Sequence, residues 1–193
     1  MANSKLVIVE GAQGAGKTTV TDYIRNAMNY TNLYRLCGTA DTTITGKQKA
    51  TVMYENLINY MKSLENCSIN LLFDRTFFTE ENYCRLGYKE YSFTDEYDKL
   101  LEQFSKLDFK IYYITLYLEK EEEFEKRLDR KGKVELDYLK FKSENSIKQQ
   151  REYLKMADEI KQRYPNINVI KMENGKDFEE TKKELDKIIE EKI

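Results

Sequence analysis

EGAQGAGKTT, residues 10–19, places three of the chain's 8 glycines in front of a lysine and two threonines. The stretch follows an apolar run at residues 5–9, whose lack of polar alternation predicts a strand buried on both faces, and leads into a predicted helix at 18–29. Residues 11–18 match the pattern GxxxxGK[ST] in full, in the strand-to-helix context that it requires. Glycines let backbone N–H groups converge on phosphate oxygens, and the helix N-terminus adds a positive dipole end. The stretch therefore predicts a binding loop for a di- or triphosphate.

The residues of this phosphate loop have expected roles. Lys17 would reach the β- and γ-phosphates and act in catalysis, and the Thr18 hydroxyl would ligate Mg²⁺, so ATP and Mg²⁺ are the expected cofactors. The alternative is a glycine-rich turn that binds no ligand. The residues predicted to bind the nucleotide are Gly11, Ala12, Gln13, Gly14, Ala15, Gly16, Lys17, Thr18 and Thr19.

A cation in such a site needs a partner carboxylate, normally at the end of a neighbouring buried strand. Asp74 closes the apolar run INLLFD, residues 69–74, and is the predicted metal partner. Arg75 follows at once, so one charge can lie near the metal while the other reaches an anion. The alternative is a salt bridge at the strand end that serves structure only.

Composition bounds the class of protein. With 193 residues, 40% hydrophobic and 34% charged, the chain fits one compact domain over residues 1–193, and its apolar runs are too short to span a bilayer. No secretory signal is visible, and the scattered Cys37, Cys67 and Cys84 suit a reducing compartment, so we expect a cytoplasmic protein without a membrane partner. The net charge of -2 makes a nucleic-acid partner unexpected.

The chain contains no histidine. This excludes Ser/His/Asp and Cys/His nucleophile systems, HExxH zinc sites and imidazole general bases together. Any chemistry must therefore depend on carboxylates, lysine, arginine and a bound cation.

Apolar runs that predict strands alternate with helical patterns along the whole chain. Helical spacing is shown by Met53, Leu57, Met61 and Leu64, by an amphipathic segment around 97–107, by a long segment at about 136–164, and by a last helix capped by Asp177 and Glu180. The alternation predicts an α/β fold with a parallel sheet covered by helices on both faces, in three layers. The predicted strands lie at 5–9, 33–37, 69–74, 109–118 and 166–172.

EGAQGAGKTT, the DRT of residues 74–76 and an arginine-rich segment further on, in that order, resemble the thymidylate kinase and deoxynucleoside kinase group of P-loop kinases. Gln13 stands where thymidylate kinases carry an acid, and DRT lies between their DR motif and the ERS of deoxynucleoside kinases. The resemblance implies a P-loop NTPase fold and an acceptor bound by Arg75. A homodimer is implied by the resemblance alone.

Three further segments gain roles from this resemblance. RLDRKGKVE, residues 127–135, resembles the kinase lid, which implies catalytic roles for Arg127 and Arg130 with help from Lys131 and Lys133; the alternative is that these basic residues complement a helix dipole. FFTEENYCRLGY, residues 77–88, resembles the substrate-binding helix, although core packing is an alternative for each aromatic residue. NGKDF, residues 174–178, lies where the group binds adenine. The residues predicted to bind the acceptor are Arg75, Phe78, Tyr83, Arg85 and Asp41.

These expectations converge on ATP-dependent phosphoryl transfer to a nucleoside monophosphate, with a thymidine-type base, or to a deoxynucleoside. Asp41 is the only candidate for a general base. The lack of a clear base favours a monophosphate as acceptor, because a phosphate oxygen is already ionised and needs no strong base. Two alternatives stay open: a kinase for a polynucleotide 5′-hydroxyl or another small alcohol, and a non-catalytic nucleotide-binding regulatory protein.

Overall fold

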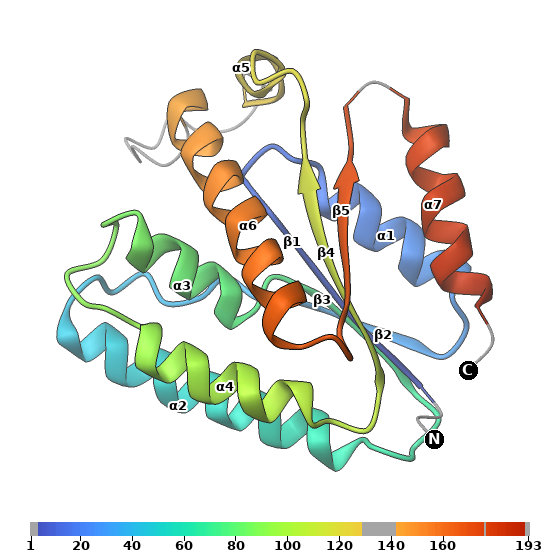
Figure 1. Cartoon of the computed structure of the whole chain (residues 1–193), viewed down its shortest axis with the longest axis horizontal. Helices are drawn as coiled ribbons and strands as arrows, with labels where there is room; N and C mark the ends of the chain where they lie inside the picture. The colour runs from blue at the N-terminus through green and yellow to red at the C-terminus, as the bar shows by residue number, and fades with distance from the viewer. Residues whose placement is uncertain (1–3, 129–141, 176, 192–193) are drawn as a thin grey trace.

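The computed structural model describes residues 4–128, 142–175 and 177–191 (Figure 1). Its centre is a 5-stranded parallel sheet with the strand order β2-β3-β1-β4-β5. The predicted strands are thus confirmed in kind and order along the chain, with ends that shift by a few residues. The strands are β1 (Lys5–Gly11), β2 (Thr31–Arg35), β3 (Asn70–Asp74), β4 (Lys110–Tyr117) and β5 (Asn168–Glu173).

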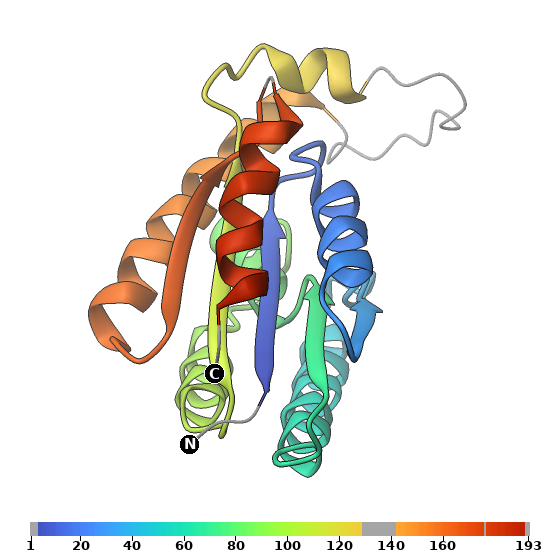
Figure 2. The same ribbon diagram turned by 90° about the vertical axis from the view of Figure 1, so that its right-hand side faces the viewer.

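Helices cover both faces of the sheet, as predicted. In β1, Leu6 and Ile8 pack against α2, α3, α4 and α6, whereas Val7 and Val9 pack against α1, α5 and α7. Figure 1 shows α6, α3, α4 and α2 to the left of and below the strands and α1 and α7 to their right, and Figure 2 shows α5, in yellow, at the top beyond the ends of the strands. The helices are α1 (Lys17–Ala27), α2 (Ile44–Ser63), α3 (Phe77–Arg85), α4 (Thr94–Ser105), α5 (Glu123–Leu128), α6 (Ser143–Arg163) and α7 (Phe178–Glu190).

In two helices the buried positions differ in part from the apolar positions along the sequence. In α2 the buried stripe runs through Ala50, Tyr54 and Ile58 to Met61, and the other predicted core positions, Met53, Leu57 and Leu64, are only partly buried. In α6 the C-terminal half buries Met156, Ala157 and Ile160, but the N-terminal half buries Ser146, Gln149 and Gln150. Polar side chains are therefore buried at the end of α6 that lies near the phosphate loop.

Aromatic side chains of α3 and α4 fill the core on the α6 side of the sheet. Phe77 and Phe78 stack with 4.3 Å between ring centroids, and Phe78 also lies 4.6 Å from the Tyr113 ring. Phe104 meets both phenylalanines edge-on at 5.9 Å. Because Phe78 has 0% exposed surface, the structure places it in the core and not in a binding pocket, which corrects its predicted role in acceptor binding.

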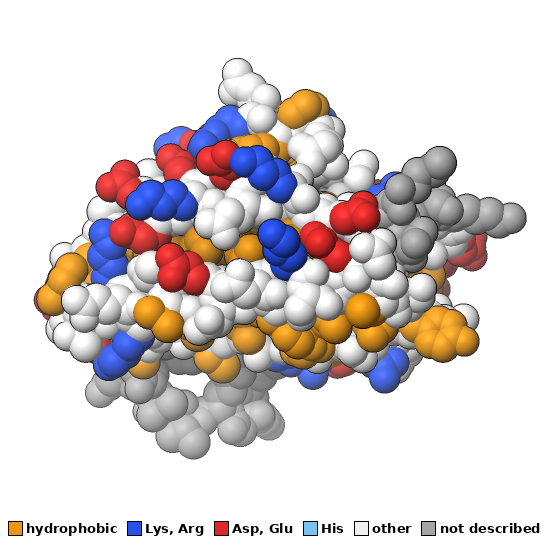
Figure 3. Space-filling view, turned by 90° about the horizontal axis from the view of Figure 1, so that it is seen from below, with side chains coloured by type: hydrophobic (Ala, Val, Ile, Leu, Met, Phe, Trp, Pro, Cys, Tyr) orange, Lys and Arg blue, Asp and Glu red, His pale blue; other side chains and the backbone are white. Residues whose placement is uncertain are grey.

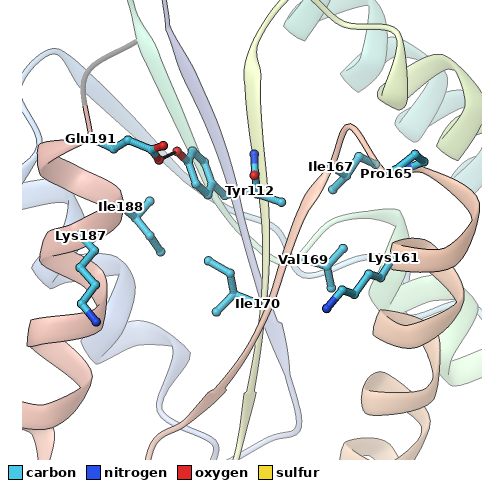
Figure 4. A pocket seen from close by; sticks show the side chains of 10 residues that line it. Tyr112, Lys161, Pro165, Ile167, Val169, Ile170, Lys187, Ile188 and Glu191 are labelled. Atoms are coloured by element: carbon cyan, nitrogen blue, oxygen red, sulfur yellow. Dashed lines mark hydrogen bonds between the residues drawn. The ribbon is translucent and has the colours of Figure 1, made fainter.

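The surface has two apolar features away from the phosphate loop. A hollow of about 600 Å³ lies at the outer edge of β5, where Figure 4 shows Ile170 and Ile188 on the α7 side and Ile167 and Val169 on the α6 side. Figure 3, a view from below Figure 1, shows hydrophobic side chains scattered among charged ones. Of the large hydrophobic side chains that are most exposed, Ile44, Val52 and Tyr60 belong to α2.

None of the described helices is both long enough and apolar enough to cross a membrane. The predicted homodimer stays a prediction.

Replacing Phe78 by alanine tests its place in the core. The Phe78→Ala variant should lose about 3–5 kcal/mol of unfolding free energy, because it leaves a cavity among aromatic neighbours, measured by urea denaturation. Val52→Ala, at a side chain that is 57% exposed, should change it by less than about 0.5 kcal/mol. Equal small effects of the two substitutions would contradict the core assignment.

Candidate functional site

The phosphate loop leaves the sheet at the end of its central strand. β1 ends at Gly11 and α1 begins at Lys17, and the backbone between them turns through positive φ angles at Gly14 (86°) and Gly16 (95°). A Cβ atom on Gly16 would lie 2.3 Å from Nδ2 of Asn174, which donates a hydrogen bond to the Ala15 carbonyl at 2.7 Å. Both the conformation and the close approach therefore require glycine at position 16.

The predicted nucleotide-binding side chains gather around this loop. The Lys17 ammonium is buried and donates to the carbonyls of Gly11 at 2.7 Å and Ala12 at 2.9 Å. Thr18 and Thr19 lie exposed in the first turn of α1, at the end of the helix that favours negative charge. The lysine, the hydroxyls and the helix end thus lie within one short segment. Their roles in binding ATP stay predictions.

Asp74 lies beside the start of the phosphate loop. It is the last residue of β3, in register with Val9 of β1, and only 7% of it is exposed. Its ion-pair partner in the structure is Arg35 of β2, at 3.8 Å between Nε and Oδ2, which gives the structural alternative some support. A carboxylate and the Thr18 hydroxyl are hard oxygen donors, so the residues present fit Mg²⁺ with its remaining ligands taken from phosphate and water.

Arg75 stands in a left-handed backbone conformation, with a φ of 73°. Such a conformation costs about 1–3 kcal/mol in a residue with a side chain and often occurs at functional sites. Burial lowers the pKa of Arg75. The interactions with Tyr83, Tyr153 and the carboxylates of Asp74 and Glu10 raise it by more than burial lowers it, so the net pKa is raised. The guanidinium therefore stays charged, and Tyr83 is among the groups that interact with it. The role of Tyr83 in acceptor binding stays a prediction.

Arg85 lies apart from this group. Its guanidinium bonds to Glu81 at 2.7 Å, Glu152 at 3.0 Å and Glu159 at 2.8 Å, and lies 5.7 Å from the centre of the Tyr97 ring. These contacts tie α3 to α6 and to α4. Three carboxylates leave the guanidinium little capacity for a substrate, so the structure assigns Arg85 a structural role in place of the predicted one.

Asp41 is engaged at the start of α2. One carboxylate oxygen accepts from the backbone and hydroxyl of Thr43, at 3.0 and 2.7 Å, and the other pairs with Lys49 at 2.8 Å. The Lys49 and Thr43 hydrogen bonds lower the pKa of Asp41 well below its usual range. A carboxylate of such low basicity accepts protons poorly, which argues against Asp41 as a general base.

Arg127 lies between the phosphate loop and the segment after β5. It donates to the carbonyls of Asn174 at 2.7 Å and Gly175 at 2.6 Å, and more weakly to that of Gly14 at 3.4 Å. The side chain thus holds the predicted adenine-binding segment against the phosphate loop. The other predicted lid residues, Arg130, Lys131 and Lys133, lie outside the described residues.

Some residues of the site were missed by the sequence analysis. Gln149 of α6 is 1% exposed, and its side-chain oxygen accepts a hydrogen bond from the Gln13 backbone N–H at 3.2 Å. The side-chain amide of Asn82 of α3 donates to the main-chain carbonyl of Gln149 at 3.1 Å. Among the described residues, Nε2 of Gln149 and Oδ1 of Asn82 are buried without a partner. Gln149 lies on the part of the buried α6 face that also carries Ser146 and Gln150, so the apolar spacing along the helix gave no signal for this contact.

Glu10 is a buried carboxylate at the end of β1, with 0% exposed surface. It accepts hydrogen bonds from the Thr76 backbone at 2.7 Å, the Thr76 hydroxyl at 3.3 Å and the Thr79 hydroxyl at 2.7 Å. The pKa of Glu10 is raised to about 7, because the effect of burial exceeds the opposing effects of the Thr79 and Thr76 hydrogen bonds and of the Lys17 and Arg75 charges. Other titratable groups that face it are Tyr54, Tyr83, Tyr113 and Tyr153.

Solved structures with the same fold include nucleotide and nucleoside kinases. Thymidylate kinase from Candida albicans superposes with a TM-score of 0.70 at 17% identity, covering 98% of this chain and 92% of that chain. YorR protein from Bacillus subtilis, in complex with phosphorylated GDP, gives 0.59 at 16% identity over 95% and 93%. Deoxyadenosine kinase from M. mycoides, with dCMP and dCDP bound, gives 0.51 at 15% identity over 96% of each chain.

These likenesses establish the three-layer α/β fold that the resemblance of the motifs predicted. No protein-family model matches the sequence, and the comparison with curated proteins gives no significant match.

Replacing Gly16 by alanine tests the fit of the phosphate loop. Gly16→Ala should abolish measurable ATP binding in calorimetry, because the new methyl group would displace Asn174 and deform the loop. Gly87 also has a positive φ, 72°, but nothing within 4 Å of its missing Cβ. Gly87→Ala should therefore cost about 1 kcal/mol of stability and leave ATP binding unchanged. ATP binding to Gly16→Ala with wild-type affinity would contradict this account of the loop.

The pH dependence of stability tests the environment of Glu10. The pKa of Glu10 is raised from 4.5 to about 7 in the folded protein, so the folded state holds this proton more tightly than the unfolded state. The contribution of Glu10 to the unfolding free energy is therefore complete below pH 4.5 and is lost as the pH rises through about 7. The unfolding free energy of Glu10→Gln relative to wild type should therefore rise between these pH values by an amount on the order of 2–3 kcal/mol. Urea denaturation from about pH 5 to about pH 8 measures it. A difference that does not vary with pH would refute the prediction.

Proposed function

We propose that this protein is a kinase that uses ATP and Mg²⁺ to phosphorylate a nucleoside monophosphate or a deoxynucleoside. The observation that carries the proposal is the position of Asp74 and Arg75 at the end of β3, beside the phosphate loop that leaves the adjacent strand β1. The site for the triphosphate and the Arg75 guanidinium, which would bind the acceptor, thereby lie next to each other. The fold shared with thymidylate and deoxyadenosine kinases supports this assignment.

The donor nucleotide would lie along the phosphate loop. Backbone N–H groups of residues 16–18, at the N-terminal end of α1, would favour its phosphates. Lys17 would leave the Gly11 and Ala12 carbonyls, which hold it at 2.7 and 2.9 Å, and neutralise charge on the β- and γ-phosphates. The adenine would lie near residues 174–175, which Arg127 holds against the loop.

Thr18 and Asp74 would hold the magnesium ion, which when bound neutralises charge on the phosphates during transfer. The remaining work falls to the chain's own residues. Arg75 would bind and orient the acceptor, and its charge is secured by the carboxylates of Asp74 and Glu10. Positioning and charge neutralisation supply most of the catalysis in phosphoryl transfer, and this set of residues provides both.

The acceptor that the site favours is a monophosphate. Asp41, the candidate base, is hydrogen-bonded to Thr43 and Lys49 and has a lowered pKa, so it is a poor acceptor for the proton of a sugar hydroxyl. A phosphate oxygen is already ionised and needs no base, and it is a natural ligand for Arg75. A thymidine-type base is the first choice, because the fold matches thymidylate kinase with the TM-score of 0.70.

A panel of acceptors tests the function. ADP release in the presence of ATP and Mg²⁺ should appear with a nucleoside monophosphate, thymidine monophosphate first, and should exceed that with the matching nucleoside. Lys17→Ala should lower kcat by at least about 100-fold and Arg75→Ala should raise the acceptor KM. Lys106→Ala, at an exposed lysine that directly follows α4, should have wild-type kinetics.

The contrary outcome is equally specific. ATP binding without turnover on any nucleoside or monophosphate would show that the protein is a nucleotide-binding regulator. Normal turnover by Lys17→Ala would contradict the mechanism, whichever acceptor is used.

A further inference from the structure

The backbone of Arg75 is held on both sides by β1. Its own N–H donates to the Val9 carbonyl at 3.2 Å, and the next N–H, of Thr76, donates to the Glu10 carboxylate at 2.7 Å. These two partners are consecutive residues of β1, immediately before the phosphate loop. A left-handed arginine, with φ of 73°, persists only where its surroundings determine the conformation, and these two hydrogen bonds fix the peptide groups on either side of it.

Glu10 also holds the first turn of α3. Thr76 is the N-cap residue of α3, and its own side chain makes no capping hydrogen bond to the helix backbone. The Glu10 carboxylate lies at this helix end and bonds to Thr76 and Thr79, at 2.7 Å in the shortest contact with each. These bonds hold the N-cap residue and a side chain of the first turn, and they thereby fix the start of the helix that directly follows the DRT motif.

The network extends to the helix that follows the predicted lid. When Glu10 is ionised, the Thr79 hydroxyl donates its single proton to it, and the Tyr153 hydroxyl, 2.9 Å away, then donates to Thr79. Tyr153 lies on α6, is 1% exposed, and faces both Glu10 and Arg75. One carboxylate therefore connects β1, α3 and α6 at the point where Arg75 stands.

We infer that Glu10 is a positioning residue that aligns Arg75 with the phosphate loop. It acts through the backbone at residues 75 and 76 and through the start of α3, and it touches neither substrate. The assignment of Arg75 to the acceptor rests on the proposed function. The conformation that Glu10 imposes on Arg75 does not depend on it.

Glu10→Gln keeps the size of the side chain and removes its charge. The acceptor KM should rise about 10- to 100-fold, because the guanidinium is misplaced, while the ATP dissociation constant from calorimetry stays within about twofold of wild type. A wild-type acceptor KM in the folded variant would overturn the inference. So would equal losses for ATP and acceptor, which would place the effect in the phosphate loop.

A crystal structure of Glu10→Ala, which removes both acceptor oxygens, gives a result that needs no activity. Residue 75 should leave the left-handed region once the Thr76 N–H loses its acceptor. A φ that stays near 73° would overturn the inference even if the kinetics changed. Absence of turnover in the wild-type protein would instead count against the proposed function, and the conformation of residue 75 would still decide the role of Glu10.

Threonine substitutions separate this network from general loss of stability. Thr79→Val should raise the acceptor KM by about three- to tenfold, and Thr79→Ser, which keeps the hydroxyl, should restore it. Thr31 is a buried threonine at the start of β2 whose hydroxyl donates to the Met28 carbonyl at 2.7 Å. Thr31→Val removes a comparable hydrogen bond far from Arg75 and should leave both substrate constants unchanged. Equal effects of the two valine variants would show that Thr79 serves stability only.

Discussion

The structure depends on the burial of β1 between two parallel neighbours. Its backbone pairs with β3 on one side and β4 on the other, and its side chains Leu6 to Val9 are fully buried in the two cores. A strand fixed on both edges and both faces has no freedom to shift its register. The point where the chain leaves the sheet at Gly11 is thereby set, and with it the position of the phosphate loop relative to Asp74. Burial of four apolar side chains thus determines the geometry of a polar site.

The fold and the phosphate loop could be predicted from sequence because their signals are local. The apolar runs before Glu10 and Asp74 predicted buried strands. The alternation of strands with helices predicted that the strands pair in parallel. The glycines at 14 and 16 have positive φ angles, which give the loop the turn that its glycine content predicted. Asp74 next to β1 also followed, since parallel strands bring their carboxyl ends to the same edge of the sheet.

The acceptor side was harder to predict because its residues depend on how helices turn. α3 carries Phe78 into the aromatic core and Arg85 towards Glu152 and Glu159, whereas Tyr83 of the same helix faces Arg75. Nothing in the order FFTEENYCR distinguishes these directions. Gln149 was missed for the same reason, because its contact with Gln13 joins residues 136 positions apart. Residue types at short spacing indicate a phosphate site well, but a site assembled from separate helices needs the tertiary structure.

The amide of Asn174 has a consequence for how the protein is made. It bonds to Ala15 at a sequence separation of 159 residues, and Arg127 bridges the same two segments. The phosphate loop is encoded near the start of the chain, yet β4 and the segment after β5 must be present before the loop has all its supports. During synthesis from the N-terminus, most of the chain must therefore leave the ribosome before this loop can be completed. A nascent chain interrupted before Asn174 would carry the whole motif and lack the structure that shapes it.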